Sequence, residues 1–386
     1  MAEATVIKPD LDFVKGVMAA GGESLKKCYQ CATCSVVCNV TPDKNPFPRK
    51  EMIWAQWGLK EKFVGNPDVW LCHQCNDCTA YCPRGAKPGE VLGAIRKQTI
   101  SQYSKPGFLV NIVNNKALVW LIFLIPALLL GLVLSADGTF IPAEGELIFS
   151  NFASTLQIQL VFVPAFMFGA IVGLLGMMSF FSDMKKANGV TSGDLAGSLM
   201  AMAGDIISHK KFKSCDVSKD RYLSHLLVFF SFILLGIATA IGVLYIDVLH
   251  IESPFELLGK GAPVKVFGLA GAVGLLAGVV LMIKNRFANA AKVGLGSYFD
   301  WILITIIGVI MASGILSWIT RVAGIREIAY PVYFIHLVFI FSLFVYLPYS
   351  KLAHIFYRSA AICFNKYSGR EAAAAVQMKT EAEIVS

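Results

Sequence analysis

The sequence predicts an all-α protein in which a soluble head precedes a bundle of six membrane-spanning helices. Its 386 residues are 56% hydrophobic and only 16% charged, whereas soluble domains average about 45–50% apolar and about 25% charged residues. Eight of the ten cysteines and 15 of the 34 Lys and Arg residues lie within residues 1–116, and the long apolar runs lie within 117–357. We therefore expect a head (1–105), a membrane domain (106–358) and a tail (359–386), which excludes a wholly soluble enzyme.

Eight cysteines of the head form two runs with the spacing of bacterial ferredoxins, and a proline follows the second run. In that pattern three cysteines at intervals of three wrap one [4Fe–4S] cluster, while the fourth reaches the other cluster. Zinc sites more often use two separated pairs of ligands, and disulfides are out of place in a reducing cytoplasm. Cys215 and Cys363 lie outside both runs, and we expect them to be structural. The two predicted ligand sets are Cys28, Cys31, Cys34 and Cys82, and Cys72, Cys75, Cys78 and Cys38.

Two helices are expected in the head, over residues 47–63 with an interruption at Gly58, and over residues 88–102 with Pro88 near the start. These inserts favour a helical ferredoxin-like head over a small β-rich ferredoxin. The run from Ser104 to Gly107 is the expected boundary before the first span. His73 lies within the second cysteine run, and we expect it to form a hydrogen bond or to have no special role. No two cysteines are adjacent, so we expect electron relay without substrate chemistry in the head.

Six stretches are long and apolar enough to cross a membrane, since a spanning helix needs about 20 mostly apolar residues. The beginning of the sequence is mixed polar and does not resemble a cleavable signal peptide. The apolar segment 195–209 is followed by two lysines, so we expect it at the inner membrane surface or beneath the head. Small residues four apart, such as Gly169 and Gly173 or Gly274 and Gly278, are expected to let helices approach closely. The predicted spans are 117–136, 156–181, 223–246, 263–283, 299–320 and 331–350.

Lys and Arg residues fall mainly on one side of this topology. The head, with the loops and tail on its side, holds 30 of the 34, and the loop 137–155 holds none. Because cytoplasmic loops carry the excess of Lys and Arg, we expect a bacterial cytoplasmic (inner) membrane protein with its head and both termini in the cytoplasm. A buried soluble helical core would not sort its loop charges in this way.

Two histidines near the last predicted span are 18 residues apart, which is five helical turns. If the sixth helix continues through residue 356, His336 and His354 share one face and stand about 27 Å apart, nearly one bilayer core. Polar residues inside spans usually have a function, and two such imidazoles suit two stacked b-type haems. The alternative is that His354 is merely interfacial. The pattern therefore predicts a six-helix cytochrome b bundle.

The other histidines supply candidates for the opposite faces of these haems. His225 is expected to pair with His354 on the inner haem, with His209 as a competitor. The outer haem should use His336, and His250 is the candidate partner. A continuous helix from His225 to His250 would span about 37 Å, so either His250 folds back or the outer haem is five-coordinate or takes another ligand. Nearby cations could neutralise haem propionates or simply anchor the positive side; they are Arg221, Lys351 and Arg358.

The cysteine runs CYQCATCSVVC and CHQCNDCTAYCP resemble the iron–sulfur C subunit of heterodisulfide reductases. The segment RYLSHLLVFFSF and the helix from His336 to His354 resemble the cytochrome b (E) subunit of those enzymes and the gamma subunit of respiratory nitrate reductase. The fusion of both modules, over roughly residues 20–360, resembles the C subunits of quinone-interacting membrane-bound oxidoreductase complexes of sulfate-reducing bacteria. One departure is that Leu235 stands ten residues after His225, where the gamma subunits have a second histidine.

This resemblance implies menaquinone as the membrane partner, flavin- and iron–sulfur-containing A and B subunits in the cytoplasm, and adenylylsulfate reductase as the eventual acceptor. Electrons from menaquinol would then pass through two b haems and two [4Fe–4S] clusters to the soluble subunits. The same chain could instead carry electrons from a cytoplasmic donor to menaquinone. A third hypothesis is a haem-free, membrane-anchored cluster module that docks other subunits. A transporter is less well supported because the spans hold few charged residues, and no nucleic-acid-binding fold is recognisable.

Overall fold

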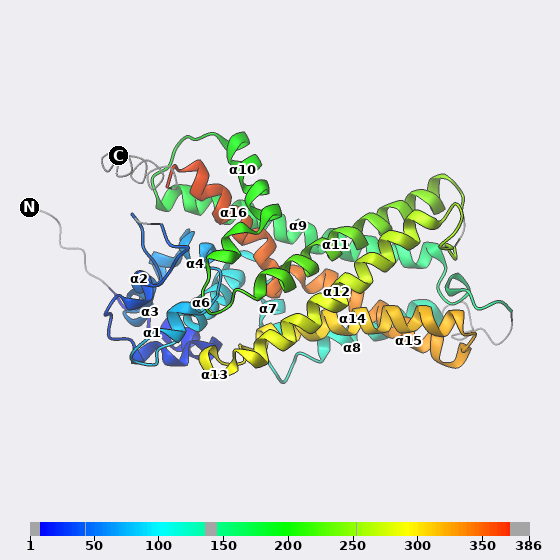
Figure 1. Ribbon diagram of the computed structural model, residues 1–386, viewed down its shortest axis with the longest axis horizontal. Helices are drawn as coiled ribbons and strands as arrows, with labels where there is room; N and C mark the ends of the chain where they lie inside the picture. Colours follow the sequence, from blue (N-terminus) through cyan, green and yellow to red (C-terminus); the bar gives the residue numbers. More distant parts are fainter. Residues whose placement is uncertain (1–7, 43, 136–144, 252, 371–386) are drawn as a thin grey trace, which may run out of the picture.

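The computed structural model describes residues 8–42, 44–135, 145–251 and 253–370, and within these ranges all regular structure is helical. The head lies at one end of the molecule, and the long helices run away from it as a bundle (Figure 1). Five helices in the described ranges are long and apolar enough to cross a membrane. The chain is therefore a membrane protein with a helical head. These five are α9 (Thr155–Ala187), α11 with η6 (Arg221–Val248), α12 (Ala262–Ala288), α14 (Tyr298–Val322) and α15 with η7 (Arg326–Tyr349).

The first predicted span, 117–136, corresponds to α8 (Leu121–Ser135), which has 15 residues. A spanning helix needs about 20 residues, so α8 as described is too short to cross unaided. It packs against α15, and its residue Leu130 is buried there. The predicted span ends among residues 136–144, which lie outside the described ranges. Six spans therefore stay a prediction.

The head is a set of short helices arranged around α6 (Pro88–Tyr103), whose residues Val91, Leu92 and Ile95 are fully buried. The expected helix over 47–63 is divided into two at Gly58, as the sequence indicates. Gly58 has a φ of 67°, and a Cβ there would lie 2.8 Å from the carbonyl oxygen of Asp10, so only glycine fits. The head elements before α6 are α1 (Leu11–Val17), η1 (Met18–Gly22), η2 (Glu23–Lys27), α2 (Thr33–Val36), α3 (Arg49–Gln56), η3 (Lys60–Phe63), α4 (Asp68–Leu71) and α5 (Asp77–Ala80).

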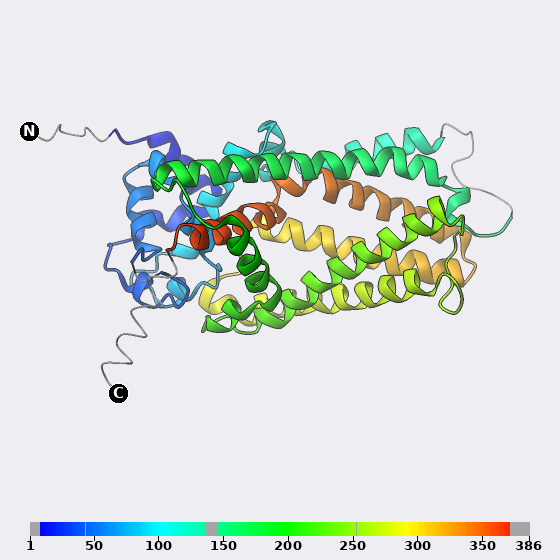
Figure 2. The ribbon, with the colours of Figure 1, turned by 90° about the horizontal axis from the view of Figure 1, so that it is seen from above.

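Small residues let the long helices cross closely, as expected from their spacing. A Cβ on Gly169 of α9 would lie 2.2 Å from the Phe344 carbonyl oxygen of α15. On α12, a Cβ on Gly274 or Gly278 would likewise contact α11, at Ser231 and Val228 respectively. Figure 2 shows α11 and α12 running side by side over most of their length. No comparable packing joins α11 to α9, α14 or α15 in the described part of the chain, and α11 is the least buried of the five candidate spans.

The head and the bundle share one continuous core through α16 (His354–Tyr367). The Trp70 and Tyr357 rings lie 5.2 Å apart between centroids, and the hydroxyl of Ser104 donates to the Pro348 carbonyl at 2.7 Å. The expected boundary at Ser104 is thus a buried junction. The remaining elements are α7 (Phe108–Asn114), η4 (Phe149–Asn151), α10 (Leu195–Ser208), which packs on α16, η5 (Lys210–Ser214), α13 (Ala290–Val293) and η8 (Lys351–Ala353).

One expectation about the last span is wrong. The helix that carries His336 does not continue through residue 356, because α15 ends at Tyr346 and two short 3-10 turns precede α16. Pro348 interrupts the backbone hydrogen-bond ladder, and the side chain of Ser350 caps the next turn by accepting from the Leu352 N–H. His354 therefore begins a separate helix, and the shared face inferred from five helical turns does not exist.

Candidate functional site

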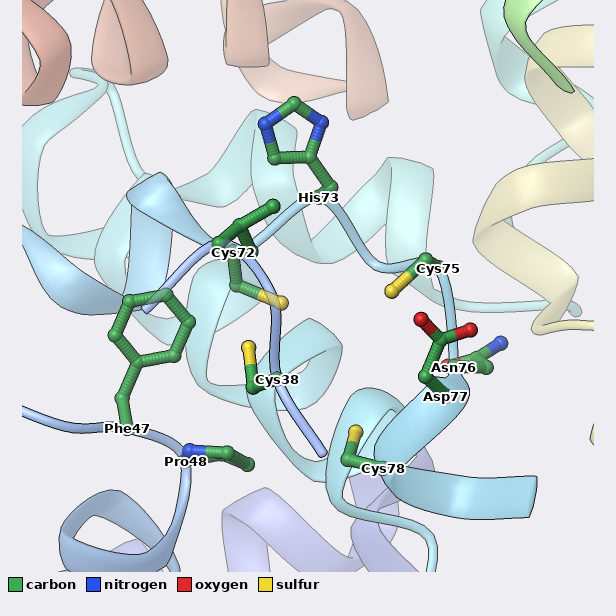
Figure 3. Close-up of a pocket in the computed structure, with 10 residues that line it drawn as sticks. Cys38, Phe47, Pro48, Cys72, His73, Cys75, Asn76, Asp77 and Cys78 are labelled. Carbon is green, nitrogen blue, oxygen red and sulfur yellow. The ribbon is translucent and has the colours of Figure 1, made fainter. Parts of the chain in front are cut away.

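The eight cysteines of the two runs surround two pockets in the head. The first pocket is lined by Cys28, Cys31, Cys34 and Cys82. The second pocket is lined by Cys38, Cys72, Cys75 and Cys78. Figure 3 shows the sulfur atoms of the second set pointing toward one space. The fourth cysteine of each run thus lies with the first three of the other, which is the grouping that the sequence spacing predicts.

The two cysteine loops repeat one backbone conformation. Gln30 and Ala32 in the first loop, and Gln74 and Asn76 in the second, all have left-handed φ angles between 51° and 69°. The Gln30 N–H donates to Cys28 Sγ at 3.4 Å, and the Gln74 N–H donates to Cys72 Sγ at 3.3 Å. A backbone N–H that donates to a cysteine sulfur stabilises the thiolate form of that sulfur. In each loop this bond therefore favours the thiolate of the first cysteine.

The protonation of these thiols indicates which ligand fits. Burial raises the pKa of Cys34 to about 11 and that of Cys38 to about 12, and it also raises the pKa of Cys78 well above its ordinary value. Neighbouring cysteines add to the effect because thiolates repel one another. Four such thiols ionise together only when a metal replaces their protons. Sets of four thiolates suit iron–sulfur clusters or zinc, so the residues present fit two clusters.

Three arginines from different elements converge on the second cysteine loop. Arg96 of α6 and Arg358 of α16 both donate to the Cys72 carbonyl, the latter at 3.1 Å. Arg221, at the start of α11, donates to the Gln74 carbonyl at 2.5 Å. Two of the three belong to the membrane part, so the bundle places positive charge beside the second pocket. Cations there favour the reduced, more negative state of a cluster.

His73 is held within this arginine group rather than facing solvent. Its Nε2 accepts from the Arg358 guanidinium at 2.6 Å, and its ring packs edge-on against Phe212. Burial and the neighbouring arginine cations hold the pKa of His73 well below its ordinary range. The imidazole is therefore neutral and acts as an acceptor, consistent with the hydrogen-bonding role expected for it.

The segment before α11 closes over the second pocket. The Asp77 carboxylate accepts the backbone N–H groups of Asp216 and Val217 at 2.9 and 3.0 Å, and the Ser218 hydroxyl donates to the Cys75 carbonyl. The bonds link the cysteine loop directly to the chain that leads into the membrane. The second pocket is thus an interface between head and bundle.

Cys215 lies in the same segment and is buried against the second pocket. Its sulfur, Cys75 Sγ and an Asp77 carboxylate oxygen all lie within 4.8 Å of one another. The sequence pattern indicates only a structural role for Cys215, because nothing near it in the chain points to a site 140 residues earlier. Cys363 is also buried, and it lines neither pocket.

Three histidines gather where the bundle meets the second loop. His209 Nε2 lies 3.0 Å from His225 Nδ1, and the ring centroids of His225 and His354 are 6.3 Å apart. The Nδ1 of His354 donates to the Lys351 carbonyl at 2.8 Å, which leaves its Nε2 as the nitrogen with a free lone pair. The structure thus brings together His225 and His354, the pair predicted for the inner haem. It also places His209, the predicted competitor of His225, beside them.

The outer histidines are not brought together. His336 on α15 packs against Gly314 of α14, and its Nδ1 lies 2.9 Å from the Ile310 carbonyl oxygen. His250 is exposed in the chain that follows η6, with a φ of 53°. Although both residues are described, the structure gives no contact between them. The pairing of His250 with His336 therefore stays a prediction that the geometry does not favour.

The cations expected beside haem propionates all have protein partners. Arg221 and Arg358 bind carbonyls of the second cysteine loop. Lys351 pairs with the buried carboxylate of Asp300 on α14, and Arg286 Nη1 lies 3.8 Å from the same carboxylate. These side chains therefore brace the junction between bundle and head.

Comparison with known families gives two matches. Residues 24–86 match the family described as a 4Fe-4S dicluster domain. Residues 115–376, more than half of the chain, match the family described as citrate utilization protein B. The chain belongs to the citrate utilization protein B family. Citrate utilization protein B of Escherichia coli is 23% identical over 385 residues, which cover 91% of this chain and 93% of that protein.

The head has further relatives outside this family. It is 34% identical over 101 residues to the C subunit of the H(2):CoB-CoM heterodisulfide,ferredoxin reductase of Methanothermobacter marburgensis, covering 26% of this chain and 52% of that protein. It is 34% identical over 85 residues to a protein of Archaeoglobus profundus described as similar to the C subunit of heterodisulfide reductase, covering 22% and 45%. The match thus spans about half the length of these relatives. No solved structure matches the chain.

In this member of the citrate utilization protein B family, these matches confirm the predicted class of the head domain. It is an iron–sulfur electron-transfer domain, homologous to the C subunit of an oxidoreductase complex. The resemblance of the membrane part to cytochrome b subunits stays a prediction.

Proposed function

We propose that this chain is the membrane electron-transfer subunit of a quinone-linked oxidoreductase. Menaquinol is oxidised in the membrane part, and electrons leave through the head to flavin- and iron–sulfur-containing A and B subunits, which supply adenylylsulfate reductase. The observation that best supports this proposal is the direct connection between the three histidines at the head end of the bundle (His209, His225 and His354) and the second cysteine pocket. His354 opens α16, and one turn later Arg358 donates to both His73 and the Cys72 carbonyl.

The inner histidines fit a b-type haem. His225 and His354 would hold its iron, because their ring centroids are 6.3 Å apart, which leaves space for a metal bound by one nitrogen of each ring at about 2.0 Å. The backbone bond at His354 Nδ1 leaves Nε2 for iron, as an orienting hydrogen bond does in metal sites. When bound, haem supplies one-electron carriage.

A second b haem is proposed on His336, whose Nδ1 is likewise engaged by the Ile310 carbonyl. His250 is the proposed second histidine ligand of this outer haem, and the alternative is a five-coordinate haem held by His336 alone. For the clusters, we propose the two cysteine sets that line the pockets as ligands. The bias of Lys and Arg toward the head side supports a cytoplasmic head on the inner membrane.

The full-length likeness to citrate utilization protein B of Escherichia coli favours a second candidate. In it, the chain serves citrate utilization and electrons flow in the reverse direction: a cytoplasmic donor reduces the clusters, and menaquinone is the acceptor. The same residues hold the same groups in both directions, so the relative redox potentials of donor and acceptor decide the direction.

An anaerobic optical spectrum of the purified protein, before and after addition of a reduced menaquinone analogue, tests the proposal. We expect reduced b-type haem bands to rise. Haem that responds only to dithionite would instead favour the reverse direction, and cluster absorbance without haem would leave a membrane-anchored cluster module. Haem content should fall in His225→Ala and His354→Ala and stay constant in the control Lys186→Ala, which changes an exposed side chain away from every histidine. Unchanged haem in the first two variants would reject the inner ligand pair.

A further inference from the structure

The two cysteine pockets differ in what surrounds them. The cysteines of the second are less exposed: Cys72 and Cys78 are each less than 9% exposed, and Arg221 and Arg358 of the membrane part bind its loop. The second pocket therefore lies on the side of the head that contacts the membrane part.

The first pocket opens to solvent instead. Cys31 is exposed, and the neighbouring Tyr29 and Val36 are 67% and 81% exposed. The hydrogen bonds given for residues 28–36 all lead to other head residues, among them Arg49 and Gln56. A group held in this pocket thus lies at the surface of the head, with an aromatic and an aliphatic side chain beside it.

The rim of the first pocket is basic. Residues 23–49 and 81–88 contain six Lys and Arg residues but only Glu23 and Asp43 as acids. Among these cations, Lys26, Lys27, Lys44, Arg49 and Arg84 are exposed. The Arg84 guanidinium lies 3.9 Å from the centroid of the Tyr29 ring, which holds the exposed aromatic in place. An aromatic centre within a charged rim is typical of protein interfaces, and aromatic and Arg residues dominate their binding energy.

We propose that the surface around the first pocket, formed by Lys26, Tyr29, Cys31, Val36 and Arg84, docks an acidic electron-transfer protein. The first cluster is then the site of exchange with the soluble partner, and the second cluster is internal. The proposal deepens the proposed function because it assigns the soluble partner a place and a charge. The positive rim would attract the acidic surface of the partner and so raise the association rate. Because salt screens this attraction, the association rate would fall as ionic strength rises.

The test uses oxidised flavodoxin, an acidic one-electron flavoprotein, as the probe. The full chain with its clusters is reduced by dithionite, freed of excess reductant, and mixed with flavodoxin in a stopped-flow spectrometer. The rate is read from the flavin absorbance. Because electrons are loaded by dithionite, the result does not depend on quinol oxidation or on haem, and failure of the proposed function would leave this test intact.

We expect Lys26→Glu and Arg84→Glu to lower the second-order rate about tenfold at low salt, and the wild-type rate to fall as salt rises. Tyr29→Ala should lower the rate at all salt concentrations, since it removes contact area rather than charge. Lys186→Glu, which changes the same charge at an exposed position outside both segments, is the control. Equal cluster content by electron paramagnetic resonance is required of every variant. Rates unchanged in the rim variants, or lowered equally in Lys186→Glu, would overturn the proposal.

Discussion

Arg358 connects the membrane part to the second cysteine loop through two bonds, one to the Cys72 carbonyl and one to His73 Nε2. Replacement by Gln removes a positive charge while keeping a hydrogen-bond donor. We expect the midpoint potential of the second cluster to become more negative, because the reduced cluster loses a nearby cation. Losing roughly 1–2 kcal/mol of interaction corresponds to a shift on the order of 50–100 mV.

A redox titration followed by electron paramagnetic resonance checks this prediction. The first cluster, which Arg358 does not contact, is the internal control, and Arg358→Lys should retain most of the potential. Equal shifts of both clusters would indicate a change in the fold of the head rather than local electrostatics.

Glu51 makes the stability of the head depend on pH. It is fully buried, its Oε2 has no hydrogen-bond partner, and burial raises the pKa of its carboxyl to about 8. The folded protein therefore keeps a proton that the unfolded chain releases above its ordinary pKa of about 4.3. Stability is then fully present below about pH 4.3 and falls as the pH rises toward 8, by roughly 3–4 kcal/mol at pH 7.

Glu51→Gln should remove this loss, so the variant should unfold at a higher temperature than the wild type at pH 7–8 and at a similar temperature near pH 4.5. Circular dichroism of the detergent-solubilised protein during heating measures the difference. A variant that is less stable at pH 8 would show that Glu51 is ionised and that its ion pair with Lys50 stabilises the head.

The grouping of the cysteines around the two pockets was predictable from sequence, because three cysteines of each group come from one local run and the ferredoxin pattern supplies the fourth from the other run. Cys215 and Arg358 were not assigned to the second loop, since each meets it across 140 or more residues. Contacts of that kind depend on how α11 and α16 dock, and no local pattern encodes them. Arg358 offered a partial signal, because a cation near a predicted haem ligand is conspicuous, but the sequence did not indicate the Cys72 carbonyl and His73 as its partners.

At the scale of elements, five predicted spans correspond to long helices because an apolar run of sufficient length determines both helix formation and membrane insertion. The break between α15 and α16 was missed because the 3.6-residue period of His336 and His354 was extrapolated through Pro348. Pro348 and Ser350 were the available signals, one a helix breaker and the other a helix cap. A period counted across a proline does not establish a shared face.

The crossing of α9 and α15 depends on Gly169. A Cβ at this position would lie 2.2 Å from the Phe344 carbonyl oxygen, and a backbone atom cannot move aside without shifting α15. We expect Gly169→Ala to destabilise the bundle by about 1–3 kcal/mol and to lower the unfolding temperature in detergent. Gly131→Ala on α8 is the matched control, because its Cβ meets nothing within 4 Å and alanine favours a helix. Equal effects of the two variants would contradict a close crossing at Gly169.

At the scale of the whole molecule, the two pockets lie in series between the bundle and solvent. The second is bound by Arg221, Ser218 and Arg358 of the membrane part, and the first contains Cys31, the one exposed cysteine of the described residues. The fourth cysteine of each run lies in the pocket of the other, so the two sites are adjacent. Under the proposed function, this order predicts that every electron moving between membrane and solvent passes through the second cluster.

Removing each cluster separately tests that order. In Cys28→Ala/Cys34→Ala, which removes ligands of the first cluster, a menaquinol analogue should still reduce the second cluster, but transfer to flavodoxin should fall to background. In Cys75→Ala/Cys78→Ala, reduction of the first cluster and of flavodoxin should both be lost, because the connecting site is missing.

Freeze-quenched samples examined by electron paramagnetic resonance distinguish the two clusters, and dithionite shows that the remaining cluster is intact. Reduction of the first cluster by quinol at the wild-type rate in the second variant would mean that electrons bypass the second pocket. The arginines that join it to the bundle would then serve only to hold the head in place.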